Sequence, residues 1–306
     1  MARFALRRAV DLVVTVAGVM TIVFVMLRLS GDPLGLVAPQ DASAEELNEL
    51  RHAFGFDQPL WTQYAQFLAR AVQGDLGQSL QFRRPAVELV LDTLPMTLLL
   101  TAAAIALSAA IAIPAGTLAA FRRGRPADRA IMTGTLVGQS IPYFWLGIML
   151  IMLFAVRLGW LPTSGSGSLA HLILPALTLS ATSMARTARL VRAEMLGVLR
   201  QDYIRTTLAK GLTTRAMLFR HALRNAMLPA MTTLALDTGI LLGGAVVTET
   251  IFAWPGLGRL IVQGILLRDF PVVQAGVLYL SITFVLINGS VDGLYAILDP
   301  RIRKAA

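Results

Sequence analysis

The stretch that decides the fold is Asp202-Tyr203-Ile204-Arg205-Thr206-Thr207-Leu208-Ala209-Lys210-Gly211, which continues through Arg215, Phe219, Arg220, Leu223, Arg224 and Asn225 to Pro229. It is basic and amphipathic, and it lies between segments that are apolar enough to cross a membrane. Lys210-Gly211 predicts the end of a helix, because a cation favours the last turn and glycine readily adopts the left-handed conformation that follows. Thr213 or Thr214 can cap a second helix. The stretch therefore predicts two short helices at an angle, exposed at the cytoplasmic surface as a rigid knob.

The second of these helices carries an apolar stripe. The residues that recur at spacings of three and four, and so share one face, are Ala216, Phe219, Leu223 and Ala226. The arginines of this helix, which lie mostly off that face, are Arg215, Arg220 and Arg224. The stripe either fills a groove on a partner or braces the knob against the membrane helices, and both alternatives stay open.

Composition identifies a membrane protein. Of the 306 residues, 56% are hydrophobic and only 15% are charged, with a mean hydropathy of +0.66, whereas soluble domains carry about 25% charge. The chain has no cysteine, which excludes a disulfide framework and a thiolate metal site. Its three histidines are far apart in the sequence, so no metal site of ordinary ligands is expected.

Six apolar segments predict an all-α integral membrane protein with six transmembrane helices. The first lies within residues 1–29, and its apolar run is longer than the roughly 7–15 residues of a signal-peptide core. A small extracytoplasmic segment at 30–93 separates it from a core at 94–298 and a tail at 299–306. The five spans of the core are predicted at about 94–121, 130–156, 169–185, 226–248 and 270–298.

The positive charges predict which side faces the cytoplasm. Of the 27 Lys and Arg residues, 19 precede the first span or fall in 122–129, 186–225 and 299–306, all on one side of the six-span arrangement. The positive-inside rule makes that side cytoplasmic, with both termini inside and 30–93 outside. The net charge of +9 therefore reflects orientation, and no nucleic acid is expected as a partner.

The stretch from 202 to 229 resembles a known family. It is similar to the cytoplasmic "EAA" loop of bacterial ABC importer permeases, which docks into the ATPase subunit. Arg205-Thr206-Thr207, with Gly211 four residues after Thr207, occupies the EAA-x3-G positions, and His221–Pro229 resembles the closing segment of the peptide and nickel branch. There is no Glu at 205 and Gly211 to Pro229 is long, as is usual in the peptide branch. The resemblance assigns ATPase coupling to Tyr203, Arg205, Thr206, Thr207, Lys210, Gly211, Arg215, Phe219, Arg220, Leu223, Arg224, Asn225 and Pro229.

The interval between the last two spans carries the most specific resemblance. Residues 248–260 and 268–274 are similar to the external loop of peptide and nickel ABC permeases. The interval is predicted to be an amphipathic re-entrant or gate-like element, with Trp254 suited to the membrane interface. The candidate gate residues are Glu249, Trp254 and Pro255.

Three acidic residues lie within apolar spans. Asp11 is near a helix end and close to Arg7 and Arg8, so it is taken as structural, which leaves Asp237 and Asp292. A carboxylate in a span is costly and normally faces a cavity or a partner group. Lining of a translocation pathway and structural hydrogen bonding are both open for these residues.

The sequence shows no catalytic or nucleotide-binding motif. It has no G-x4-G-K-[ST], G-x-S-x-G or H-E-x-x-H motif, so we expect no enzyme and no cofactor in this chain. ATP and Mg would be bound by partner ATPase subunits.

The resemblance implies the type I ABC importer fold and a permease subunit that moves peptides, or a related solute such as glutathione, across the bacterial inner membrane. The implied partners are a second homologous permease, one or two ATPase subunits, an extracytoplasmic solute-binding protein and membrane lipid. A nickel-chelate permease is the alternative. A proton-coupled secondary transporter, from another class, would usually show an internal hydropathy repeat, and none is visible.

Overall fold

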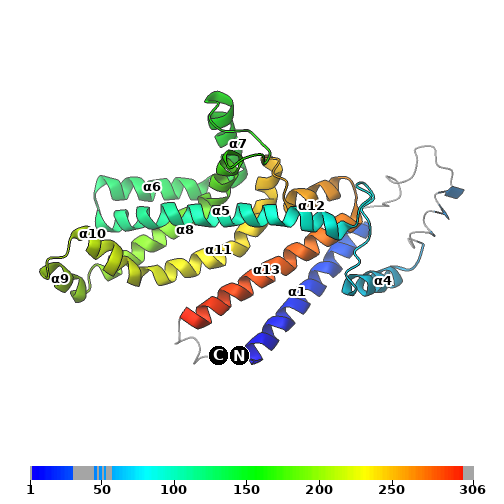
Figure 1. Cartoon of the computed structure of the whole chain (residues 1–306), viewed down its shortest axis with the longest axis horizontal. Coiled ribbons are helices and arrows are strands. Elements are labelled where there is room, and N and C mark those ends of the chain that lie inside the picture. Colours follow the sequence, from blue (N-terminus) through cyan, green and yellow to red (C-terminus); the bar gives the residue numbers. More distant parts are fainter. Residues whose placement is uncertain (1, 30–44, 47, 50–51, 53–56, 299–306) are drawn as a thin grey trace. The chain divides into compact units, whose positions relative to one another are not determined.

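The computed structural model describes residues 2–29, 45–46, 48–49, 52 and 57–298, and for 2–9, 27, 208 and 292–298 the backbone alone. Within these residues the regular structure is helical, and the one β-type pairing is an isolated bridge between Gln78 and Pro85 (Figure 1). Much of the predicted 30–93 segment and the whole 299–306 tail lie outside the described residues. The chain forms two compact units, Met1–Thr97 with Pro255–Leu286 and Leu98–Trp254 with Ile287–Ala306.

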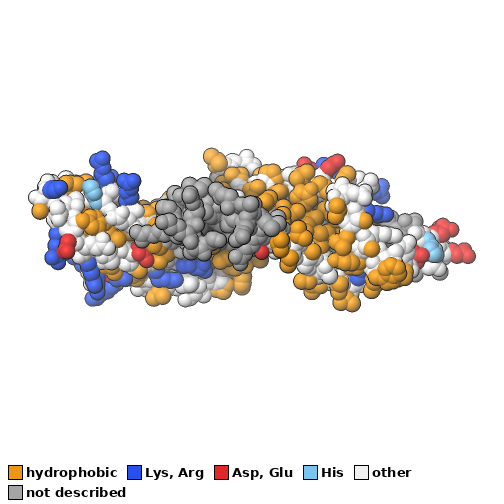
Figure 2. Space-filling model, turned by 90° about the horizontal axis from the view of Figure 1, so that it is seen from below, with side chains coloured by type: hydrophobic (Ala, Val, Ile, Leu, Met, Phe, Trp, Pro, Cys, Tyr) orange, Lys and Arg blue, Asp and Glu red, His pale blue; other side chains and the backbone are white. Residues whose placement is uncertain are grey.

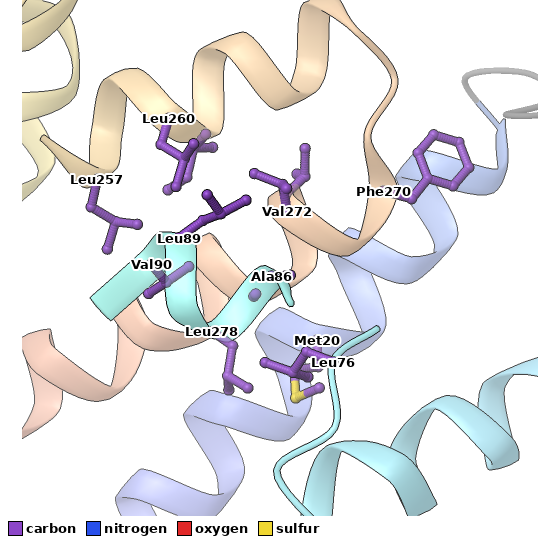
Figure 3. Packing of buried hydrophobic residues seen from close by; sticks show 13 residues of the cluster. Met20, Leu76, Ala86, Leu89, Val90, Leu257, Leu260, Phe270, Val272 and Leu278 are labelled. Atoms are coloured by element: carbon purple, nitrogen blue, oxygen red, sulfur yellow. The ribbon is translucent and has the colours of Figure 1, made fainter. Parts of the chain in front are cut away.

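The first unit combines the N-terminal part of the chain, Met1–Thr97, with the later segment Pro255–Leu286. Its helices are α1 (Ala2–Leu29), α4 (Leu60–Val72), the start of α5 (Ala86–Phe121), α12 (Leu257–Leu266) and most of α13 (Phe270–Leu298). Their buried side chains form one apolar cluster (Figure 3). Leu257 begins α12 and donates its backbone N–H to Thr97 Oγ1 at 2.8 Å, which fixes α12 against α5. The labelled members of the cluster are Met20, Leu76, Ala86, Leu89, Val90, Leu257, Leu260, Phe270, Val272 and Leu278.

The second unit holds the remaining helices. They are the rest of α5, α6 (Pro126–Ser140), α7 (Tyr143–Leu150), the π-helix η1 (Ile151–Arg157), α8 (Ala170–Val198), α9 (Asp202–Ala209), α10 (Thr214–Ala216), the π-helix η2 (Met217–Ala222) and α11 (Leu223–Ile251). α8 packs against α6, α7 and α11, and it crosses α5 very closely at Gly116. A Cβ on Gly116 would lie 2.5 Å from the carbonyl oxygen of Ala188 and 2.8 Å from Cβ of Val191.

The predicted span at 130–156 is not a single helix. α6 ends at Ser140, Ile141 and Pro142 are both extended, and the chain restarts as α7 and η1 at an angle of 106°. Proline disfavours helical backbone at the preceding residue, which accounts for the break. α5 also differs from its prediction, because it begins at Ala86 rather than at 94.

Three helices among the described residues are long and apolar enough to cross a membrane: α5, the continuous helix Thr214–Ile251, and α13 over Phe270–Val291. The bent pair of α6 with α7 and η1 makes a fourth if it is counted as one span. The other two predicted spans are α1, with a shorter apolar part at Val10–Met26, and α8, whose apolar part ends at Arg186.

Candidate functional site

The predicted knob is a turn between α9 and the helix that leads into α11. α9 ends at Ala209, and Gly211 has φ +81°, the left-handed conformation expected there. The hydroxyl oxygen of Thr213 accepts the backbone N–H of Ala216 at 3.3 Å, so Thr213 is the cap of the second helix. That helix does not stop after the knob. It runs without interruption through α10, η2 and α11 from Thr214 to Ile251, with Pro229 inside it.

A hydrogen bond ties the two arms of the knob together. Nδ2 of Asn225, near the start of α11, donates to the hydroxyl of Tyr203 on α9 at 2.7 Å. Thr206 and Thr207 donate their hydroxyls to backbone carbonyls of α9, at Asp202 and Tyr203, so these side chains belong to the helix itself. The structure therefore brings together two residues, Tyr203 and Asn225, that the sequence placed in the coupling region separately.

The predicted apolar stripe is right for Ala226, which is fully buried, and for Leu223, which packs against the same buried cluster, but it is wrong for Phe219. Met217 and Leu218 are buried together with Ala222, whereas Phe219 is 49% exposed and Leu223 is partly buried. The cause is η2, since its i→i+5 hydrogen bonds widen the turn and rotate the following side chains away from α-helical positions. Ile204 of α9 joins this buried set, which braces the knob. Phe219 stands outside it as a large exposed apolar side chain.

The outer surface of the knob is basic. Five cations of the predicted site have exposed side chains: Arg205, Lys210, Arg215, Arg220 and Arg224. The one acid near them, Asp202, lies 4.0 Å from Arg205 in a contact that is almost fully exposed and so contributes little. Figure 2 shows Lys and Arg side chains gathered over the end formed by α9 and α10. This surface is suited to an acidic partner.

Sequence reasoning missed a buried ion pair in the same unit. Asp128, in the first turn of α6, receives two bonds from Arg192 on α8, at 2.7 and 2.8 Å, and one from the backbone N–H of Gly124 at 2.9 Å. Asp128 is only 3% exposed. The signal available in the sequence was the acidic first turn after Pro126, but nothing there identifies a partner 64 positions away.

Asp237 is buried and paired. Its carboxylate accepts the Ser183 hydroxyl at 2.7 Å and Nη1 of Arg186 at 2.5 Å, both from α8. These contacts give Asp237 a structural hydrogen-bonding role between α8 and α11. Asp292 lies in α13, and its side chain is outside the described part of the chain.

The candidate gate residues stand where α11 ends. Glu249 is fully buried, and its carbonyl accepts the backbone N–H of Trp254 at 2.8 Å. Trp254 is 2% exposed, so the expectation of a side chain at the membrane interface is wrong. The turn between them contains Ala253 with φ +47°, an uncommon conformation for a residue with a Cβ. Pro255 follows and is partly buried. Within the described residues, no group of three or more His, Asp or Glu side chains is placed to hold a metal ion.

Comparison with known proteins gives one consistent result. Residues 112–304 match the family described as "Binding-protein-dependent transport system inner membrane component", and residues 1–101 match the N-terminal component of the same kind of system. The chain is 43% identical over 304 residues to the glutathione transport system permease protein GsiC of Escherichia coli strain K12 and of Shigella dysenteriae serotype 1 strain Sd197, covering 99% of each chain.

The chain belongs to this family. It is an ABC importer permease of the peptide branch and a multi-pass protein of the inner membrane. The type I permease fold agrees with a solved structure of the MetNI methionine ABC transporter in inward-facing conformations. That structure aligns with a TM-score of 0.55 at 20% identity, over 69% of this chain and 96% of the solved one. The permease's all-helical architecture, predicted from composition and resemblance, is thereby confirmed.

Proposed function

We propose that this permease carries glutathione or another small peptide inward across the bacterial inner membrane, and that a partner ATPase drives the transport. The proposed solute class rests on the full-length similarity to GsiC, which is named as a glutathione transport system permease. The permease itself would not be an enzyme, with ATP and Mg held by the ATPase subunits.

The main support for coupling between an ATPase and the membrane helices is the continuous helix Thr214–Ile251. Its 38 residues rise roughly 57 Å along the helix, while a hydrocarbon core is roughly 30 Å thick. The same helix that crosses the membrane therefore extends well beyond it and begins within the knob. A rigid element of this length can pass a movement at one end to the other.

The knob supplies the attachment for this lever. The exposed Phe219 would enter an apolar groove on the ATPase, and the surrounding arginines would meet acidic side chains at its rim. The buried residues Ile204, Met217 and Leu218 would keep the knob rigid when the ATPase moves. Gly211 and the bond between Tyr203 and Asn225 would fix the angle between the two arms.

The remaining assembly follows from family and charge. We place the knob and both termini in the cytoplasm, and residues 30–93 and 249–270 outside. A second homologous permease would complete the translocation path, one or two ATPase subunits would bind the knobs, and an extracytoplasmic solute-binding protein would deliver the solute.

The test is reconstitution. The permease is purified with the ATPase and permease subunits expressed from neighbouring genes, placed in proteoliposomes, and given its binding protein with radiolabelled glutathione, a dipeptide or a nickel chelate. We expect ATP-dependent accumulation of glutathione or of the dipeptide. Accumulation of the nickel chelate alone would replace the peptide assignment, and uptake driven by a proton gradient without ATP would overturn the mechanism.

A further inference from the structure

The first unit contains a cleft that lies apart from the knob and its long helix in the sequence. It has a volume of about 590 Å³ and lies among the end of α1, one side of α4, the loop at 75–83 and the first turn of α13. Three aromatic rings line it, from Phe24, Phe67 and Phe270. Phe24 and Phe67 are stacked with their centroids 5.7 Å apart, so this wall is ordered.

Three arginines reach into the same cleft: Arg28, Arg70 and Arg83. The guanidinium of Arg28 lies over the rings of Phe24 and Phe270, at 5.3 and 6.0 Å from their centroids. Among the described residues, neither Arg70 nor Arg83 forms an ion pair. The one acid of the lining, Asp75, is occupied by its own loop, since its carboxylate accepts the backbone N–H of Gly77 at 2.9 Å. In the described part of the chain, Arg70 and Arg83 are therefore two cations at the cleft without an acidic partner, and they could bind an anion.

The loop that presents Arg83 is held in an unfavourable conformation. Arg83 has φ 52°, a left-handed backbone that costs a residue with a Cβ roughly 1–2 kcal/mol. Buried contacts enforce it. Asp269 is 1% exposed and accepts the Ser79 hydroxyl at 2.5 Å and the backbone N–H of Gln81 at 3.2 Å. Strain of this kind persists where the surroundings fix it, and it is frequent at ligand sites.

The ends of two predicted spans lie at this cleft, which would place it near the level of lipid headgroups. α1 and α13 are predicted spans, and Arg28 is in the last turn of one while Phe270 begins the other. α4 carries apolar side chains that are widely exposed, Leu60, Trp61 and Val72, of which Trp61 is 75% exposed. Tryptophan and apolar side chains on a short amphipathic helix are typical of an element lying in the membrane interface.

We propose that this cleft binds the phosphate headgroup of an anionic phospholipid, with Arg70 and Arg83 on the phosphate and the aromatic wall against the glycerol and upper acyl chain. Guanidinium groups pair with phosphate oxygens through two parallel bonds. Choline and ethanolamine headgroups carry the same phosphate, but each adds a cation that the arginines repel, so the site favours a headgroup with net negative charge. The proposal rests on the structure of the first unit and on its membrane level, and it adds a lipid site to the transport function.

Native mass spectrometry of the full-length permease in detergent tests the proposal. Phosphatidylglycerol and phosphatidylcholine with identical acyl chains are titrated separately. We expect phosphatidylglycerol to bind on the order of thirtyfold more tightly, since each of the two arginines near the headgroup contributes about 1 kcal/mol. The double variant Arg70→Gln with Arg83→Gln should lose this preference. Arg84→Gln is the matched control, because Arg84 has the same charge, neighbours Arg83, is paired with Glu88 and Asp92, and does not line the cleft.

Two further experiments test whether the bound anion is a phospholipid or a soluble anion, and whether Arg83 contributes to binding. Glycerol 3-phosphate and glutathione, added in millimolar excess, should leave phosphatidylglycerol bound, because each lacks the acyl chains. Arg83→Gly should raise the thermal stability of the lipid-free protein by removing the left-handed strain, and it should also weaken lipid binding. Equal binding of the two lipids, an equal loss in Arg84→Gln, or displacement by glutathione would overturn the lipid assignment. None of these results depends on whether the transporter carries peptides.

Discussion

Arg192 on α8 donates hydrogen bonds to both carboxylate oxygens of Asp128 on α6, with N–O distances of 2.7 and 2.8 Å. The pair is nearly buried on the acidic side and less so on the basic side, with exposed side-chain fractions of 5% and 26%. Beyond Arg192, α8 continues only to Val198, and α9 begins at Asp202. The pair therefore anchors the helix that leads directly into the knob.

Breaking this pair should destabilise the permease strongly. Asp128→Asn or Arg192→Gln leaves one buried charged partner uncompensated, and such losses cost about 3–5 kcal/mol. Thermal unfolding of the purified protein in detergent measures the effect. The double variant Asp128→Leu with Arg192→Met removes both charges and should be less damaging than either single change. If the double variant is as unstable as the sum of the two, the pair contributes no coupling and the anchor is elsewhere.

Tyr203→Phe should loosen the knob without unfolding it. The change removes only the hydroxyl that receives the 2.7 Å bond from Asn225, and a single hydrogen bond contributes about 0.5–1.5 kcal/mol. We expect normal permease levels, retained ATPase subunits and a lower number of solutes moved per ATP. Asn225→Leu should give the same loss, and the double variant no more than either alone. Additive losses would show that the two residues act independently.

The sequence predicted the parts of the knob that depend on local chemistry. Gly211 was predicted to turn left-handed and either Thr213 or Thr214 to cap the second helix. Gly211 and Thr213 do so, because each effect is decided within a few residues. Phe219 was wrongly predicted to lie on the buried face of the second helix, since α-helical spacing does not anticipate the π-helical turn at Met217–Ala222. The pairing of Asp128 with Arg192 and of Asp237 with Arg186 depends on how helices pack, which no local pattern records.

Glycine motifs illustrate the same limit. The spacing Gly134-x3-Gly138 is of a kind that favours close helix approach, yet a Cβ on either glycine would meet no atom within 4 Å. The close approach of α5 to α8 is at Gly116, where the small-residue spacing Ala112-x3-Gly116-x3-Ala120 contains no second glycine. Its neighbours there are backbone of Ala188 and the branch point of Val191, neither of which can easily move aside.

Gly116→Ala should therefore destabilise the second unit. The added methyl would lie 2.5 Å from a carbonyl oxygen, so α5 and α8 must separate, and overpacking of this kind typically costs about 1–3 kcal/mol. Gly134→Ala is the control, because it adds the same methyl to a helix where space is open. Unfolding temperatures in detergent compare the two. Equal temperatures for Gly116→Ala and the wild type would show that the crossing is looser than the structure describes.

The predicted topology can be tested by labelling single introduced cysteines, because the chain has no cysteine of its own that would react. Gln73→Cys and Arg215→Cys introduce single thiols at exposed positions on opposite predicted sides. In spheroplasts, a membrane-impermeant maleimide should label position 73 directly and position 215 only after permeabilisation. The reverse pattern would invert the orientation and remove the knob from the cytoplasm.

The coupling assignment depends most directly on Gly211 and Arg205. Gly211 has φ +81° and no atom within 4 Å of an added Cβ, so Gly211→Val acts through the backbone alone. A left-handed turn costs a residue with a Cβ roughly 1–2 kcal/mol, and more for a β-branched side chain. Gly211→Asn is the matched control, because asparagine tolerates this conformation. Arg205→Glu instead reverses an exposed charge on the basic surface while leaving the fold in place.

We expect Gly211→Val and Arg205→Glu to lose ATPase subunits or to uncouple ATP hydrolysis from uptake, with the permease still inserted, while Gly211→Asn transports normally. ATPase retention and solute uptake are measured in membranes that contain equal amounts of permease. The two variants fail for different reasons, the first by changing the angle between α9 and the long helix, the second by repelling an acidic rim. Raising the salt concentration should therefore weaken ATPase binding to the wild type, since exposed charges are screened within about 8–10 Å. If Gly211→Val and Arg205→Glu both retain the ATPase and transport at normal rates, the knob is not the coupling element.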